Sequence, residues 1–252
     1  MINISLATLQ SFTLAYTESD VFGKLIILSL LLVSLICWVI LIFKIWQAKK
    51  VKELSLRFQT IIEKNTEHLL NLELQSLPKA SSVTIPHPYA SIFSVLKHKT
   101  MEILNKKVFF IERLGKETDQ AIYLSKTDLE LVESAVYATI SNQTKLLEKD
   151  LFILSTSVTL APFLGLLGTV WGILVTFSEL QGGASAGSNS VIIGGLSTAL
   201  STTVLGLVIA IPALVAYNYL KNNIKVVTSD MEDFVQSLLS TIEMQYRKVD
   251  IS

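Results

Sequence analysis

The sequence lacks most of what enzyme chemistry on a soluble substrate would need. Its 21 Lys and Arg balance 21 Asp and Glu, so no basic excess favours binding to nucleic acid. The single cysteine, Cys37, cannot form an intramolecular disulfide. The chain has no Gly-rich phosphate loop, no nucleophile elbow and no metal-site spacing around His68, His87 and His98, which are interpreted as solvated positions. These absences predict a non-enzymatic protein with no metal or other cofactor.

Charge is also missing from three long stretches. No Asp, Glu, Lys or Arg occurs in Leu25–Phe43 (19 residues), Leu151–Phe177 (27 residues) or Leu180–Leu220 (41 residues). A helix of about 20 apolar residues crosses the hydrocarbon core of a bilayer. The third stretch begins with a polar Gly- and Ser-rich piece, so its spanning part is predicted at 193–219. With 50% hydrophobic residues, the chain is predicted to be an all-α membrane protein with three transmembrane helices.

Lysine placement predicts the orientation of these helices, because Lys and Arg near a spanning segment resist translocation. Only Lys24 flanks the segments on one side, whereas eight lysines flank them on the other: Lys44, Lys49, Lys50, Lys52, Lys145, Lys149, Lys221 and Lys225. The N-terminus is therefore predicted outside and the C-terminus in the cytoplasm. The predicted order is an outer segment (1–24), a transmembrane helix (25–43), a cytoplasmic helical domain (44–150), a transmembrane helix (151–177), an outer loop (178–192), a transmembrane helix (193–219) and a cytoplasmic C-terminal helix (220–252).

Apolar periodicity predicts long helices in the cytoplasmic part. Helical spacing continues from the first segment to about Leu77, and a proline-containing break follows at 77–88. A second helical pattern covers Tyr89–Leu114. Lys116–Ala161 has no Gly or Pro and keeps a near-heptad apolar stripe, so we expect one unbroken helix that continues into the membrane. The C-terminal helix is amphipathic and is predicted to pack on the cytoplasmic helices.

The second and third spanning segments differ in their small and hydroxyl residues. In the second, small residues spaced 4, 3 and 4 apart form one helix stripe suited to close packing: Ala161, Gly165, Gly168 and Gly172. Thr169 lies beside this stripe and is a candidate to face an aqueous or partner-lined path. The third holds a hydroxyl cluster, a further small residue and a proline expected to bend or loosen the helix: Ser197, Thr198, Ser201, Thr202, Thr203, Gly206 and Pro212. Intramembrane hydroxyls most often bond back to their own helix.

Ionisable residues are almost absent from these two segments. Between Leu151 and Leu220 the only Asp, Glu, Lys, Arg or His is Glu179, at the outer end. Ion and proton paths through membranes usually involve an ionisable group at depth. If the chain guides ions, a partner must therefore supply the carboxylate.

Two runs resemble the TolQ/ExbB/MotA family of proton-channel subunits. They are residues 161–173, APFLGLLGTVWGI, and residues 199–218, ALSTTVLGLVIAIPALVAYN. The resemblance implies a homopentamer in the inner membrane of a two-membrane bacterium, around a one-pass TolR-like or ExbD-like partner whose Asp carries the proton. Proton flow would energise a TolA-like or TonB-like envelope-spanning protein. The resemblance also implies that Thr169 and Thr203 line the ion path. Thr198 and Thr202 are further candidates for this path. Thr198 stands where the family commonly has Glu, which leaves either the partner Asp alone or a water path past Thr198.

Three functional alternatives stay open. The ending of the third segment, Ala216-Tyr217-Asn218, and the short tail resemble the TolQ branch, which favours a Tol-Pal role in outer-membrane integrity and cell division. The first alternative is an ExbB-like role in TonB-dependent import. A MotA-like stator subunit is disfavoured because such proteins have four membrane segments. The third alternative is a non-conducting scaffold, since each proposed pore residue is also a good packing residue.

Overall fold

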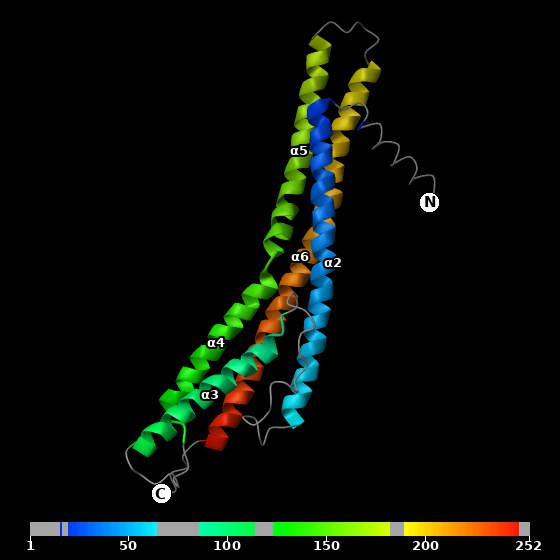
Figure 1. Ribbon diagram of the computed structural model, residues 1–252. Helices are drawn as coiled ribbons and strands as arrows, with labels where there is room; N and C mark the ends of the chain where they lie inside the picture. The colour runs from blue at the N-terminus through cyan, green and yellow to red at the C-terminus, as the bar shows by residue number, and fades with distance from the viewer. Residues whose placement is uncertain (1–15, 17–19, 65–85, 114–122, 182–188, 247–252) are drawn as a thin grey trace. The chain divides into compact units, whose positions relative to one another are not determined.

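The computed structural model describes residues 16, 20–64, 86–113, 123–181 and 189–246. The elements within these ranges are helices, which confirms the predicted all-α class (Figure 1). They are α2 (Val21–Lys64), α3 (Pro88–Arg113), α4 (Lys126–Glu148), α5 (Leu151–Gln181) and α6 (Asn189–Tyr246). In the described part, three helical stretches are long and apolar enough to cross a membrane, as predicted: Val21–Ile62, Leu151–Ser178 and Gly194–Tyr246.

The chain divides into two compact units, each with its own core. Residues 1–44 and 150–220 form the first, here called the spanning unit, and residues 45–149 and 221–252 form the second, here called the extramembrane unit. Helices α2 and α6 each contribute residues to both units. The two units are described separately below.

The spanning unit is built from α2, α5 and α6, which lie side by side (Figure 1). Ile26 and Leu30 of α2 are buried with Ala161 of α5 and Ala210 of α6. Cys37 is also buried. Large apolar side chains on the outer faces of the three helices are exposed, as an apolar solvent requires; examples are Leu35, Phe163, Leu166 and Val208.

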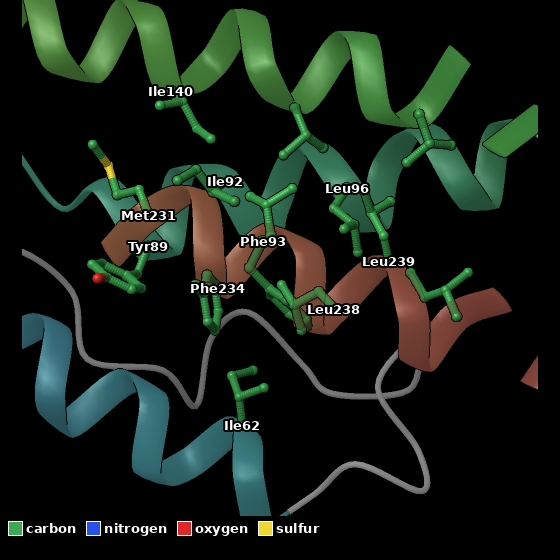
Figure 2. Close-up of a cluster of buried hydrophobic side chains, with 14 of the residues drawn as sticks. Ile62, Tyr89, Ile92, Phe93, Leu96, Ile140, Met231, Phe234, Leu238 and Leu239 are labelled. Atoms are coloured by element: carbon green, nitrogen blue, oxygen red, sulfur yellow. The ribbon is translucent and has the colours of Figure 1, made fainter. Parts of the chain in front are cut away.

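The extramembrane unit has a conventional apolar core (Figure 2). Phe58 of α2 is fully buried and its ring meets Phe93 of α3 and Phe234 of α6 edge-on, at centroid distances of 5.9 and 6.2 Å. Helix α4 adds Val132 and Val136, both with no exposed surface. The apolar stripe of the C-terminal part of α6 enters this core, as its amphipathic pattern predicts.

The prediction of one unbroken helix over Lys116–Ala161 is wrong. Helix α4 begins at Lys126, after a capping box made by Ser125 and Asp128, and ends at Glu148. The chain then turns through Asp150, which has a left-handed backbone conformation with φ of 70°, and α5 begins at the next residue. The absence of Gly did not exclude this break, because Asp is one of the few other residues that tolerate the left-handed region.

The histidine interpretation needs one correction. His87 is buried in the extramembrane unit, where its Nδ1 accepts the backbone N–H of Ala90 at 3.2 Å and its ring meets Phe58 edge-on. Burial lowers the pKa of His87 below its usual value. His98 is exposed, as predicted, and His68 lies outside the described residues, together with most of the predicted break at 77–88.

Candidate functional site

The backbones of α5 and α6 approach closely along the stripe of small residues in α5. A Cβ atom added to Gly165 would lie 2.9 Å from the carbonyl oxygen of Thr202 and 3.0 Å from Cα of Thr203. A Cβ added to Gly206, on α6, would lie 2.6 Å from the carbonyl oxygen of Ala161, which is fully buried. Real Cβ atoms do not sit this close to backbone atoms, so only glycine fits at both positions.

The same stripe continues toward the C-terminal end of α5. A Cβ on Gly168 would meet Oγ1 of Thr202 at 2.5 Å, and one on Gly172 would meet Cβ of Ala199 at 2.7 Å. The structure thus brings Ala161, Gly165, Gly168 and Gly172 of α5 against α6. Close backbone approach of this kind is how helices associate in an apolar solvent.

Three threonine hydroxyls converge on the carbonyl oxygen of Gly165. Oγ1 of Thr203 donates to it at 3.0 Å, and Oγ1 of Thr202 and Oγ1 of Thr169 each lie at 3.2 Å. We call this set the Gly165 carbonyl centre. Two of its donors come from α6 and one from α5, so the two bonds from α6 join the helices where Gly165 lets their backbones approach.

Thr169 and Thr203 also share a hydroxyl–hydroxyl hydrogen bond across the helix pair. A second acceptor, the carbonyl oxygen of Ala199, lies 3.2 Å from Oγ1 of Thr169 and 2.7 Å from Oγ1 of Thr202. Thr169 and Thr203 are half-buried, whereas Thr202 has only 5% of its surface exposed. A neighbouring helix can therefore reach Thr169 and Thr203 but not Thr202.

The remaining predicted residues lie apart from this centre. Thr198 is half-buried one turn before Thr202 and does not contribute to the Gly165 carbonyl centre among the described residues. Ser201 bonds back to the carbonyl of Ser197 at 2.9 Å, the ordinary behaviour of a helical hydroxyl. Pro212 is exposed on α6, and the helix continues through it.

A contact that the sequence reasoning missed ties α2 to α5. The Asp20 carboxylate precedes α2; its Oδ1 accepts the N–H of Gly23 at 2.9 Å, and its Oδ2 accepts Nε1–H of Trp171 at 3.0 Å. The Phe22 and Trp171 rings lie 4.4 Å apart between centroids. The available signal was the Asp directly before an apolar helix, the usual N-cap arrangement, but nothing local identifies Trp171 as its second partner.

This arrangement offers hydroxyl groups but no group that holds a proton near neutral pH. Threonine hydroxyls donate and accept hydrogen bonds and do not titrate near neutral pH. In the described part of the chain, no cluster of three or more His, Cys, Asp or Glu side chains is placed to bind a metal ion. The chemistry available between α5 and α6 is therefore that of an uncharged, hydroxyl-lined contact.

Comparison with known proteins identifies a family and several relatives that are similar to this chain. A profile of the MotA/TolQ/ExbB proton channel family matches residues 102–233. The Tol-Pal system protein TolQ of Haemophilus influenzae is 34% identical over 99 residues, covering 39% of this chain and 43% of TolQ. The biopolymer transport protein ExbB of Helicobacter pylori is 44% identical over 103 residues, covering 40% of this chain and 66% of that protein.

The ExbB protein of Aquifex aeolicus is similar to the same degree, with 40% identity over 88 residues, 35% of this chain and 59% of that ExbB. Across these three relatives, the matched region covers between 43% and 66% of their own length. Both names, TolQ and ExbB, thus occur among proteins of comparable similarity.

Proposed function

Because the chain belongs to the MotA/TolQ/ExbB proton channel family, we propose that it is a membrane subunit that couples the proton motive force to work on another protein. The observation that carries this proposal is the Gly165 carbonyl centre, where Thr169, Thr202 and Thr203 join α5 and α6. Thr169 and Thr203 line the ion path, and the buried Thr202 holds the two helices in register.

The proton is carried by a carboxylate from another chain. Between Leu151 and Leu220 the only Asp, Glu, Lys, Arg or His in the sequence is Glu179. Thr198 occupies the position where the family commonly has Glu. The partner is a one-pass protein of the TolR or ExbD kind with a membrane Asp, which moves past Thr169 and Thr203. A membrane potential supplies about 2.3 kcal/mol per charge per 100 mV, enough to bias each step of such a movement.

The chain forms a homopentamer in the inner membrane of a two-membrane bacterium. Its N-terminus is periplasmic and its C-terminus cytoplasmic, because eight lysines flank the spanning segments on one side and only Lys24 on the other. Exposed apolar side chains on α5 and α6, such as Phe163 and Val208, supply the surface that neighbouring copies and lipid cover.

The energised protein is TolA-like, which makes the process outer-membrane integrity and cell division. The TolQ-like ending of the third segment, Ala216-Tyr217-Asn218, supports this choice. An ExbB-like role, energising TonB-dependent import, is the alternative, and relatives named ExbB support it. Co-purification with a TolR-like or an ExbD-like partner distinguishes the two.

A non-conducting scaffold is the candidate from another class. It is favoured by one observation: each hydroxyl of the Gly165 carbonyl centre already has a partner within the chain. A scaffold would assemble with its partner and pass no protons.

Proton flux into vesicles tests the proposal. We expect flux when the chain is reconstituted with its Asp-bearing partner and none without it. Thr169→Val with Thr203→Val should abolish flux and leave the complex assembled, because valine keeps the shape and removes both hydroxyls. Thr156→Val is the matched control, since Thr156 is exposed and its hydroxyl donates to the carbonyl of Phe152 in its own helix. Flux without the partner, or full flux in the double variant, would refute the mechanism.

A further inference from the structure

One carboxylate joins the start of α2 to the middle of α5. The two oxygens of Asp20 have different partners: Oδ1 accepts the N–H of Gly23 and Oδ2 accepts Nε1–H of Trp171. The first bond is an N-cap, which a helix needs wherever its chain begins. The second joins residues 151 apart in sequence and has no role in starting α2. Phe22 packs its ring on Trp171 beside this bond.

Trp171 and Thr169 lie on opposite sides of α5. They are two residues apart, and a helix turns about 100° per residue, so their side chains differ by about 200° around the axis. Trp171 faces α2, where it meets Asp20 and Phe22, and Thr169 faces α6, where it meets Thr203. Holding Trp171 therefore also sets the rotation of α5 that presents Thr169 to Thr203.

We infer that Asp20 is a positioning residue, which acts through Trp171 to orient Thr169 against Thr203. Its carboxylate is a fixed acceptor, and the indole N–H is a single donor on a rigid ring, so together they specify one rotation of α5 at this level. The inference rests on the proposed function in one respect only: that Thr169 and Thr203 line the ion path. The orientation itself does not depend on ion movement.

Two substitutions remove the hydrogen bond between Asp20 and Trp171 and leave the surrounding contacts unchanged. Asp20→Asn keeps an N-cap of equal quality but has a single acceptor oxygen, so it caps α2 and loses the fixed acceptor for Trp171. Trp171→Phe keeps an aromatic ring against Phe22 and removes Nε1–H. Trp38→Phe, at an exposed position of α2, is the matched control for the loss of an indole.

The orientation is measured by disulfide cross-linking between Thr169→Cys and Thr203→Cys in a Cys37→Ala background, in the full chain with its partner. We expect Asp20→Asn and Trp171→Phe each to lower the cross-link yield about fivefold, the change that loss of one hydrogen bond makes in an equilibrium. Combining them should lower it no further, and Trp38→Phe should leave it unchanged. An unchanged yield in either single variant would overturn the inference.

Proton flux, measured for Asp20→Asn and Trp171→Phe in chains that retain both threonines, separates the two proposals. A fall in both cross-linking and flux supports the positioning role and the ion path together. A fall in cross-linking with full flux supports the positioning role and overturns the path at Thr169 and Thr203. Loss of flux with unchanged cross-linking overturns the positioning role, because Asp20 would then act by another route.

Discussion

Single residues in the spanning unit matter most where two backbones touch. Gly165 and Gly206 leave room for α5 and α6 to approach until a carbonyl oxygen of one helix lies against a Cα of the other. In lipid, apolar burial gives little drive for helix association, so this contact and its hydrogen bonds stabilise the pair. A methyl group added at either glycine would therefore weaken both the backbone contact and the hydrogen bonds.

The substitution Gly165→Ala should separate the two helices. The added Cβ meets backbone atoms of Thr202 and Thr203, which cannot rotate away as a side chain can. We expect a loss of about 1–3 kcal/mol in the free energy of unfolding, the usual cost of overpacking. Thermal unfolding in detergent measures it, with Leu166→Ala as the control, because Leu166 is exposed one residue further along. Equal, small effects of the two substitutions would contradict a tight contact at Gly165.

At the scale of helices, α4 and α5 are separated by a break at Lys149 and Asp150. The last turn of α4 closes with the N–H of Lys149 bonded to the carbonyl of Lys145 at 3.0 Å. Asp150 follows in the left-handed conformation, and its carbonyl accepts the N–H of Ile153 at 3.2 Å as α5 begins. A single residue with a left-handed backbone thus separates the two helices.

Replacing Asp150 by valine should therefore be costly, whereas asparagine should be tolerated. Both remove the same charge, but Asn visits the left-handed region readily and a β-branched side chain does not. The difference between Asp150→Val and Asp150→Asn is expected to be about 1–2 kcal/mol, the cost of that conformation for an ordinary residue. Denaturant or thermal unfolding of the two purified variants gives the comparison. If valine is as stable as asparagine at this position, the turn does not need its positive φ.

The helices were predictable from sequence to the extent that local patterns specify them. Charge-free runs and apolar periodicity identified three apolar helices and the stretch near Tyr89–Leu114, against an observed α3 of Pro88–Arg113. The break at Asp150 was missed, because no Gly or Pro announces it. The buried His87 was missed because its burial depends on Phe58, which belongs to another helix.

The candidate site was predictable only as a set of positions on two helices. Spacing identified the small-residue stripe, and the resemblance identified Thr169 and Thr203. The two hydrogen bonds that α6 makes to the Gly165 carbonyl centre join residues 37 and 38 apart, and the Asp20 to Trp171 bond joins residues 151 apart. Such pairs depend on how helices pack, which periodicity does not encode.

For the molecule as a whole, polar chemistry is concentrated in the extramembrane unit. Its Tyr89 is packed against α6, and burial together with Asp230 and Asp233 raises the pKa of Tyr89 to about 12. Lys99 and Lys106 bracket Glu102 on α3 and hold the pKa of that carboxyl near 2. The lysine distribution predicts the side of the membrane on which this unit lies, and that prediction can be measured.

Cysteine accessibility tests the orientation. Gln181, at the end of α5, and Glu148, at the end of α4, are both exposed, and the only native cysteine, Cys37, is buried. With a membrane-impermeant thiol reagent on intact spheroplasts, we expect Gln181→Cys to be labelled and Glu148→Cys to be labelled only after permeabilisation. The unsubstituted chain serves as the background. The reverse pattern would place the N-terminus in the cytoplasm.

The Gly165 carbonyl centre has a consequence for mutational tolerance. Its acceptor is a main-chain atom, so no exchange of side chains can delete it. In a saturation screen, position 165 should reject every residue for its bulk, while positions 169, 202 and 203 should accept serine, which preserves the donor. Such a screen would therefore not detect the Gly165 carbonyl as an acceptor. A backbone substitution can change the acceptor directly. Replacing the peptide bond between Gly165 and Leu166 by an ester weakens the Gly165 carbonyl as a hydrogen-bond acceptor.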